Sequence, residues 1–235
     1  MTGNLLDGKI VVPGDVFSAA DENFKLVNKI KLGPGLTTNQ AQKIIVCKSG
    51  TLRYKSPDTL WVDCHQQRYI PSKGENVIGV ITSRQGDFYK VDIGASDQAV
   101  LNCMSFEGAS KRNRPNVSNG DVVFGQLIVA NKDVEPELSC IDPSSGKANG
   151  MGILSGDGIL FTISLNLGRK LLSPDCVLLP ELGSHVSFEI IIGLNGKVAL
   201  FCKSAQQSVC IMNLIKATEY MSNTDIMKAL NKQFF

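Results

Sequence analysis

Histidine is scarce in this 235-residue chain, which leaves few ways to build a histidine-dependent catalytic site. Only His65 and His185 occur, and they fall in different parts of the sequence. A Ser-His-Asp or Cys-His arrangement would have to use one of them. Cys64 and His65 are adjacent, so on a strand their side chains would point to opposite faces. We expect both histidines to be structural or exposed.

Clustered metal ligands are also missing from the sequence. The cysteines stand at positions 47, 64, 103, 140, 176, 202 and 210 and form no C-x-x-C pair. A zinc site needs Cys and His at short spacing, and a two-metal nuclease needs convergent carboxylates, whereas the acids here are scattered singly. The sequence therefore predicts no catalytic residue, no metal and no cofactor. Most cysteines lie in apolar company, which favours buried, reduced thiols.

Long apolar runs are absent as well, and none approaches the length that crosses a bilayer. Residues 1–4 carry neither the basic region nor the apolar core of a signal peptide. Together with reduced cysteines, these features predict a soluble intracellular protein. Hydrophobic residues make up 43% and charged residues 20%, as in ordinary globular proteins, and the length suits two or three compact units. The formal charge is only +2, so any contact with nucleic acid must come from a local cluster of cations.

The most informative region runs from residue 74 to residue 127, because its pattern predicts a small β-barrel. A strand opens at residues 74–81, Gln85-Gly86-Asp87 turns the chain, and residues 88–94 return. A second Gly-Asp pair, at residues 120–121, precedes another strand at residues 122–129. We interpret this region as an OB-type five-stranded barrel.

The returning strand separates two faces with a period of two. Tyr89, Val91 and Ile93 point one way and fill the interior, because a barrel this small must be packed with apolar side chains. Phe88 and Lys90 then lie on the outer wall, where a ring can stack a base and a cation can meet a phosphate. The alternative is that Phe88 covers a neighbouring domain.

One basic segment stands out, namely Lys111-Arg112-Asn113-Arg114-Pro115-Asn116. It supplies three cations with no acid among them. A loop of this type on an OB-type barrel can reach a phosphate backbone without reading bases. The alternative is that these cations are only a solvated part of the surface. The position of the segment between two barrel strands favours RNA binding. The candidate RNA-binding residues are therefore Lys111, Arg112, Arg114, Phe88 and Lys90.

A further cation follows a glycine at Gly146-Lys147-Ala148. The segment is similar to part of a phosphate loop, but it lacks the earlier glycine and the Ser or Thr that would bind magnesium. We interpret it as a connector.

The sequence predicts three parts, giving a mixed β and α+β fold. Residues 1–63 form a small N-terminal β-domain, with strands near residues 43–47 and 51–54 between Gly- and Pro-rich turns. Because its core is small, we expect this domain to be stabilised by contact with a partner. Residues 64–145 form the OB-type domain, and residues 146–235 form an α+β domain.

The third part has the pattern of a KH-like domain. Strands are expected at residues 159–164, 186–192 and 197–201, with a short helix at residues 165–172 that Ser173-Pro174 stops. Gly193-Leu194-Asn195-Gly196 carries the Asn-Gly pair of a two-residue hairpin. Ser204 is expected to cap a long helix and form a capping box with Gln207. The apolar face of that helix would contain Val209, Met212 and Ile215, flanked by Ile211 and Leu214.

Several stretches, taken in order, resemble the exosome component three family, the OB/KH-domain cap subunits of the eukaryotic RNA exosome. The matching stretches are Val11-Val12-Pro13-Gly14-Asp15, Gly33-Pro34-Gly35-Leu36, Trp61-Val62-Asp63, Arg68-Tyr69-Ile70-Pro71, Phe106-Glu107-Gly108-Ala109 with residues 111–116, Val129-Ala130-Asn131-Lys132-Asp133, Ala148-Asn149-Gly150-Met151-Gly152 and the Gly-x-Asn-Gly at residues 193–196. The resemblance covers nearly the whole chain. It implies an OB-type domain of the ribosomal-protein-S-one class, a KH domain, and a non-catalytic subunit seated on a ring of RNase PH-like proteins.

The residues themselves qualify this picture for the KH domain. An RNA-binding KH domain clamps the backbone with a Gly-x-x-Gly loop between two helices. The corresponding turn here is Ser173-Pro174-Asp175-Cys176, which has an acid and no glycine. We therefore interpret Gly193, Asn195 and Gly196 as a structural hairpin pressed against the neighbouring domain.

The expected function is that of an architectural subunit in 3′-to-5′ RNA processing and degradation. The N-terminal domain would fasten the protein to the ring, and the barrel would guide single-stranded RNA into the central channel. The expected partners are the RNase PH-like ring subunits, the other cap subunits and single-stranded RNA, with no membrane. The expected locations are the nucleus, nucleolus and cytoplasm. A free-standing RNA chaperone or translation factor is the alternative, and an independent ribonuclease lacks the residues it needs.

Overall fold

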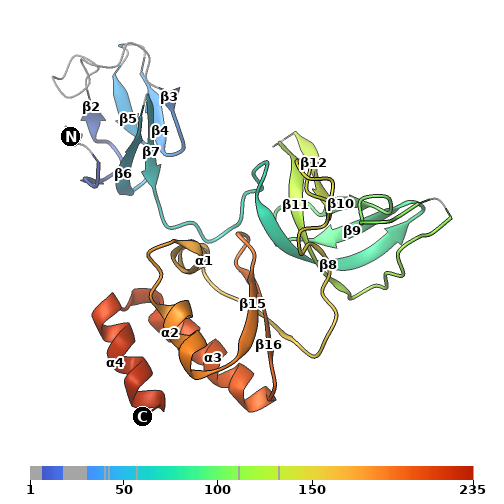
Figure 1. The fold of residues 1–235 in the computed structure, drawn as a ribbon. Coiled ribbons are helices and arrows are strands. Elements are labelled where there is room, and N and C mark those ends of the chain that lie inside the picture. Colours follow the sequence, from blue (N-terminus) through green and yellow to red (C-terminus); the bar gives the residue numbers. More distant parts are fainter. Residues whose placement is uncertain are drawn as a thin grey trace. The chain divides into compact units, whose positions relative to one another are not determined.

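The structure is a computed structural model, and it describes residues 7–17, 31–39, 41, 43–56, 58–110, 112–131 and 133–234. The chain divides into two compact units, residues 1–66 and residues 67–235. The first unit contains only strands among its described residues, whereas the second contains a barrel followed by an α+β domain (Figure 1). Each unit has its own hydrophobic core.

The first unit is built from two small antiparallel-rich sheets. One sheet has the order β1 (Ile10–Val11), β6 (Gly50–Lys55), β7 (Thr59–Asp63) and β3 (Lys31–Leu32). The other has the order β2 (Val16–Phe17), β5 (Ile44–Val46) and β4 (Leu36–Thr38). The strands predicted near residues 43–47 and 51–54 are confirmed as β5 and β6. Their buried residues include Val46, Leu52 and Leu60, which pack in one cluster.

The second unit begins with a closed five-stranded barrel, as the sequence predicted. Its strands are β8 (Asn76–Gln85), β9 (Phe88–Asp92), β10 (Ala99–Asn102), β11 (Val122–Asn131) and β12 (Val134–Ser139). They follow the order β12-β10-β9-β8-β11, and β12 also pairs with β11, which closes the barrel. The β10–β12 pair is parallel, and a short strand, β13 (Gly152–Ile153), adds to β11. This is the OB-type architecture.

The barrel interior confirms the predicted separation of faces on β9. Tyr89, Val91 and Ile93 are fully buried among the other apolar residues of the barrel. Packing is so close that a Cβ added at Gly79 would lie 2.2 Å from Cγ1 of Val91. Glycine at this point lets β8 cross over the filled interior.

A KH-type α+β domain completes the second unit. Strands β14 (Ile159–Thr162), β16 (Lys197–Cys202) and β15 (Phe188–Ile192) form an antiparallel sheet in that order. Its helices are α1 (Leu165–Leu172), α2 (Leu178–His185), α3 (Ala205–Ala217) and α4 (Asn223–Phe234), with a 3-10 turn, η1 (Thr218–Tyr220), before α4. The helices and one face of the sheet share a core that contains Leu182, Leu200 and Ile215.

Helices α1 and α3 can be compared with the caps and the apolar face expected from the sequence. The hydroxyl of Ser164 accepts a hydrogen bond from the N–H of Leu167 at 3.1 Å, so this residue caps α1. The predicted capping box at α3 is wrong, because Ser204 occupies the N-cap position without any side-chain cap bond. Val209 was expected on the apolar face of α3 but is 44% exposed, while Ile211, Leu214 and Ile215 are buried.

The cysteines also differ from the expectation. All seven are free, but only Cys103 and Cys140 are buried, and Cys47 is exposed. Apolar neighbours in sequence therefore did not guarantee burial, because short strands in a small domain leave one face open.

Candidate nucleic-acid interface

The outer wall of β9 presents an aromatic ring to solvent. Phe88 is 47% exposed and lies opposite Asn102 on β10 and Gln85 on β8. β9 and β10 are the second and third barrel strands, and in OB folds the face of these two strands binds oligonucleotides. The ring therefore has the position and exposure needed to stack a base.

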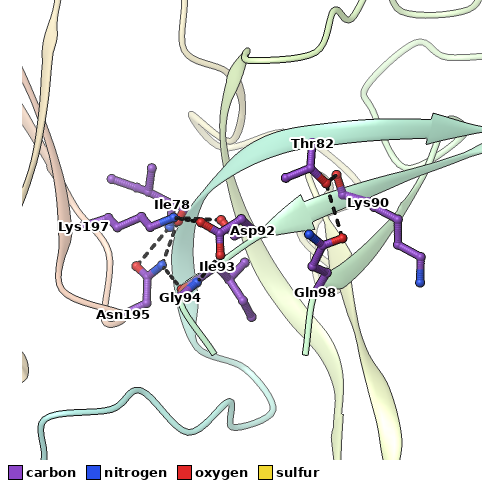
Figure 2. A network of polar contacts seen from close by, with 9 residues as sticks. All are labelled: Ile78, Thr82, Lys90, Asp92, Ile93, Gly94, Gln98, Asn195 and Lys197. Atoms are coloured by element: carbon purple, nitrogen blue, oxygen red, sulfur yellow. Dashed lines mark hydrogen bonds and ion pairs between the residues drawn. The ribbon is translucent and has the colours of Figure 1, made fainter. Parts of the chain in front are cut away.

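Lys90 shares this face but is not an isolated cation. Its Nζ lies 2.7 Å from Oε2 of Glu135 on β12, and its side chain is only 19% exposed. Its backbone carbonyl accepts a hydrogen bond from the hydroxyl of Thr82, which also bonds Gln98 (Figure 2). The Glu135 side chain is 59% exposed, so a phosphate on this face can compete with its carboxylate for the ammonium.

The basic segment lies between β10 and β11, and the structure describes two of its three cations. Arg112 is exposed and forms no ion pair with any acid that the structure describes. Arg114 Nη1 lies 2.7 Å from Oδ1 of Asp87, in the turn that precedes Phe88. Lys111 lies outside the described residues. The ion pair therefore brings one end of the basic segment to the β8–β9 turn, a contact that nothing in the sequence spacing indicated.

The KH domain lacks the features of an RNA clamp at the turn between α1 and α2. This turn contains no glycine, and Asp175 in it is exposed. The nearby cation, Lys170, donates to the carbonyls of Thr218 and Met221 at 3.3 and 2.9 Å. Its charge therefore stabilises the end of the η1 segment and is not presented to a ligand.

The β15–β16 hairpin contacts the barrel through buried hydrogen bonds (Figure 2). The side-chain amide of Asn195 donates to the carbonyls of Ile78 and Ile93, both at 2.7 Å, and its Oδ1 accepts from the N–H of Ile78 at 3.3 Å. The N–H of Leu194 donates to the carbonyl of Asn76 at 2.9 Å. The hydrogen bonds of the Asn195 side chain therefore all go to barrel backbone.

The hairpin turn differs from the two-residue Asn-Gly type expected from sequence. That type requires positive φ at both residues, but among the described residues outside glycine only Asn149 has positive φ. The N–H of Gly193 bonds the carbonyl of Lys197, so the loop has three residues and ends at Gly196, with φ of 77°. A Cβ at Gly193 would lie 2.8 Å from the backbone nitrogen of Ile78, and one at Gly196 would lie 2.6 Å from the carbonyl oxygen of Ile163. Close approach to other backbone requires these glycines.

A further contact between the same two domains was missed by sequence reasoning. Lys197 is 11% exposed, and its Nζ lies 2.8 Å from the carbonyl and 3.0 Å from Oδ2 of Asp92. Burial raises the pKa of Asp92, but the Gly94 N–H and the Lys197 ammonium overcome this and hold that pKa below its usual value. A lysine at the start of an otherwise apolar strand was the available signal, because a buried cation needs an acceptor.

The described residues contain few candidates for a catalytic nucleophile or a metal ligand. Burial raises the pKa of the Cys140 thiol to about 12, so it stays protonated. No group of three or more His, Cys, Asp or Glu able to hold a metal occurs within the described ranges. His65 is exposed, and the side chain of His185 is 21% exposed with its Nε2 3.7 Å from Oε1 of Glu181. Within the part of the chain that the structure describes, no helix is long and apolar enough to cross a membrane.

A small β-domain, an S1-type OB barrel and a KH domain in one chain define a class of multidomain RNA-binding proteins. Three family models match the corresponding segments. Residues 9–65 match "Mammalian exosome complex component RRP40, N-terminal", residues 69–152 match "Exosome complex component RRP40, S1 domain", and residues 158–206 match "KH domain". The predicted boundaries at residues 63/64 and 145/146 stay predictions.

Relatives that match over most of the chain carry the same family name. The chain is 47% identical over 201 residues to Exosome complex component RRP40 of Homo sapiens, covering 83% of this chain and 72% of that protein. Identity is 41% over 219 residues with the Drosophila melanogaster protein (93% of each chain) and 34% over 233 residues with the Saccharomyces cerevisiae protein (96% and 95%). The chain belongs to the RRP40 family of exosome complex components, which confirms the predicted family.

A solved structure supports the same fold. A crystal structure assigned to an exosome complex RNA-binding protein superimposes with a TM-score of 0.57, at 22% identity, over 71% of this chain and 97% of that one.

Proposed function

We propose that this protein is a non-catalytic, RNA-binding cap subunit of the RNA exosome. The observation that carries the proposal is the closed S1-type barrel with an exposed aromatic ring on its oligonucleotide face and a basic segment paired to the adjoining turn. Membership of the RRP40 family supports the same conclusion. The alternative of a free-standing RNA chaperone is not favoured, because it explains neither the family nor the separate N-terminal unit.

The N-terminal β-domain is proposed to dock on a ring of RNase PH-like subunits, beside other cap subunits. The barrel then guides single-stranded RNA toward the central channel for 3′-to-5′ processing, with Lys111, Arg112 and Arg114 meeting phosphates and Phe88 and Lys90 as further contacts. Nuclear, nucleolar and cytoplasmic pools follow from that role.

Purification from cells tests the assembly. A tagged version of the full chain should recover RNase PH-like proteins near one-to-one after stringent washing. Recovery of the chain alone, or with ribosomal or translation proteins in their place, would overturn the proposal.

The RNA contacts are tested by replacing Lys111, Arg112 and Arg114 together with Ala in the assembled complex. On single strands, the slope of log affinity against log salt should flatten by up to about 0.7 for each phosphate that the variant can no longer bind. A matched variant removes Lys203, Lys216 and Lys228, three exposed lysines of the KH domain. This control should keep the wild-type slope, and equal slopes in all three proteins would contradict the assignment of the basic segment.

The absence of catalysis is tested on the highly purified chain. Labelled single-stranded RNA should stay intact with and without magnesium, because phosphodiester cleavage by two metals needs convergent carboxylates. Processive shortening that follows the protein through purification would sink the proposal.

A further inference from the structure

The loop at residues 142–150 is exposed and yet held by an unusually dense set of hydrogen bonds. Oδ1 of Asp142 accepts from the N–H and hydroxyl of Ser144 at 2.9 and 2.7 Å. Its Oδ2 accepts from Ser145 Oγ at 3.1 Å and from Asn149 Nδ2 at 2.7 Å. Hydrogen bonds from Ser144 and its neighbours hold the pKa of Asp142 below its usual range. A plain connector needs no such fixed conformation.

Backbone contacts close the same loop. The N–H of Gly146 donates to the carbonyl of Asp142, and the N–H of Asp142 donates to the carbonyl of Lys147, both at 2.9 Å. Asn149 adopts a φ of 47° and Gly150 one of 79°, both in the left-handed region. Residues 149–150 lie in a turn, and successive backbone N–H groups in a turn can form a concave anion site. The backbone N–H groups of Asn149 and Gly150 donate to no acceptor among the described residues.

Lys147 is the cation that this loop presents. It is exposed, and it forms no ion pair with any acid that the structure describes. The two carboxylates in the loop's network bond to other groups: Asp142 accepts four hydrogen bonds, and Glu107 accepts one from the N–H of Ala148 at 3.0 Å. The ammonium is therefore left for an external partner.

The Glu107–Ala148 bond also joins this loop to the basic segment. Glu107 directly precedes Gly108, whose carbonyl accepts from Nδ2 of Asn113 at 3.5 Å. Asn113 lies between Arg112 and Arg114. These two hydrogen bonds place the backbone next to Lys147 and the backbone next to the two arginines on either side of residues 107–108.

We propose that residues 146–150 form a second phosphate-binding site for single-stranded RNA, continuous with the basic segment and with Lys147 as its cation. The inference rests on the proposed function, because it extends the same RNA path. A loop whose backbone is fixed before binding loses little conformational freedom when it meets a phosphate, so its N–H groups are pre-organised for that contact. The proposal assigns a binding role to Gly146-Lys147-Ala148, for which the sequence predicted a connector.

The test uses the assembled complex, a labelled single-stranded oligouridylate and a salt titration. Lys147→Gln should flatten the slope of log affinity against log salt by up to about 0.7, the value for one contact on a single strand. Lys147→Arg should keep the wild-type slope, because the charge is retained. Thermal melts of both variants should match wild type, since the side chain bonds to no described residue.

Three outcomes are informative, and the first two separate this inference from the proposed function. If the Lys111, Arg112 and Arg114 variant flattens the slope and Lys147→Gln does not, the second site is wrong and the proposed function stands. If Lys147→Gln lowers the melting temperature with an unchanged slope, Lys147 balances Asp142 and Glu107 and binds no phosphate, which also overturns the site. If neither variant changes the slope, RNA contact through this whole surface is wrong.

Discussion

At the scale of single residues, Asn195 has the most demanding role in the second unit. It is 8% exposed, yet its side chain satisfies one N–H and two carbonyls of the barrel backbone. Asn195→Ala should destabilise the protein by about 1–3 kcal/mol for each buried group left unsatisfied. Thermal or denaturant unfolding followed by circular dichroism measures this destabilisation.

Asn195→Asp is the matched variant, because it keeps the shape and changes only the amide nitrogen. A carboxylate oxygen would then face the carbonyls of Ile78 and Ile93, which are both acceptors. This variant should be at least as unstable as Asn195→Ala at neutral pH. Wild-type stability for either variant would show that the hairpin does not hold the two domains together.

The ion pair between Lys197 and Asp92 makes part of the stability depend on pH. The folded pKa of Asp92 lies below its usual value of about 3.9, so its stabilising effect is present above about pH 3.9 and is lost as pH falls through the folded pKa. Lys197→Met removes the ammonium, and with it the hydrogen bond and the charge from Lys197 that lower that pKa. The melting temperature of this variant should therefore be lower than wild type at neutral pH, and the gap should narrow on acidification below about pH 4.

Lys228→Met controls for the loss of one positive charge. Lys228 is 81% exposed, and its Nζ lies 3.9 Å from Asp225 on the surface of α4. Its melting temperature should follow wild type at every pH. A gap for Lys197→Met that stays constant with pH would contradict the assigned ion pair.

At the scale of elements, strand β9 allows binding and folding to be separated. Phe88→Ala should leave stability nearly unchanged, because the ring is 47% exposed, and should weaken RNA binding by about 1–3 kcal/mol if it stacks a base. Tyr89→Ala on the opposite face should cost about 3–5 kcal/mol of folding stability, since Tyr89 is fully buried. Unchanged RNA affinity together with a lower melting temperature for Phe88→Ala would mean that the ring packs on protein.

Elements with a strong local pattern were predictable from sequence. The strict alternation in residues 88–93 identified β9 and both of its faces, and Ser173-Pro174 identified the end of α1. The local sequence pattern did not predict conformations that depend on contacts with residues distant in the sequence. The turn at residues 193–196 takes its shape from Ile78 and Ile163, and the pairing of Arg114 with Asp87 depends on barrel closure. No spacing in the sequence records such contacts.

The candidate site also combines features that the local sequence pattern predicts with features that depend on long-range contacts. Exposure of Phe88 could be derived from periodicity alone, whereas the ion pair of Lys90 with Glu135 required knowing that β12 closes the barrel. Lys147 belongs to a segment without a complete phosphate-loop motif, so the sequence gives no reason to select it. Its significance comes from the bond between Ala148 and Glu107, which only the folded chain shows.

At the scale of the whole molecule, the chain contains two independent reporters of folding. Trp61, the single tryptophan, lies on β7 in the first unit, whereas every helix among the described residues belongs to the second. Tryptophan fluorescence therefore follows residues 1–66, and the helical signal in circular dichroism follows residues 67–235. Each signal reads a unit with a separate core.

This separation gives a test of how far stability is shared along the chain. Asn195→Ala should lower the midpoint of the helical transition and leave the Trp61 transition at its wild-type midpoint, because Asn195 bonds only residues of the second unit. Leu60→Ala should do the reverse, since Leu60 is fully buried in the core of the first unit and such a truncation costs about 2–5 kcal/mol. Joint movement of both signals in either variant would show that the chain unfolds as one cooperative body, and the N-terminal β-domain could not then be treated as a separate docking module.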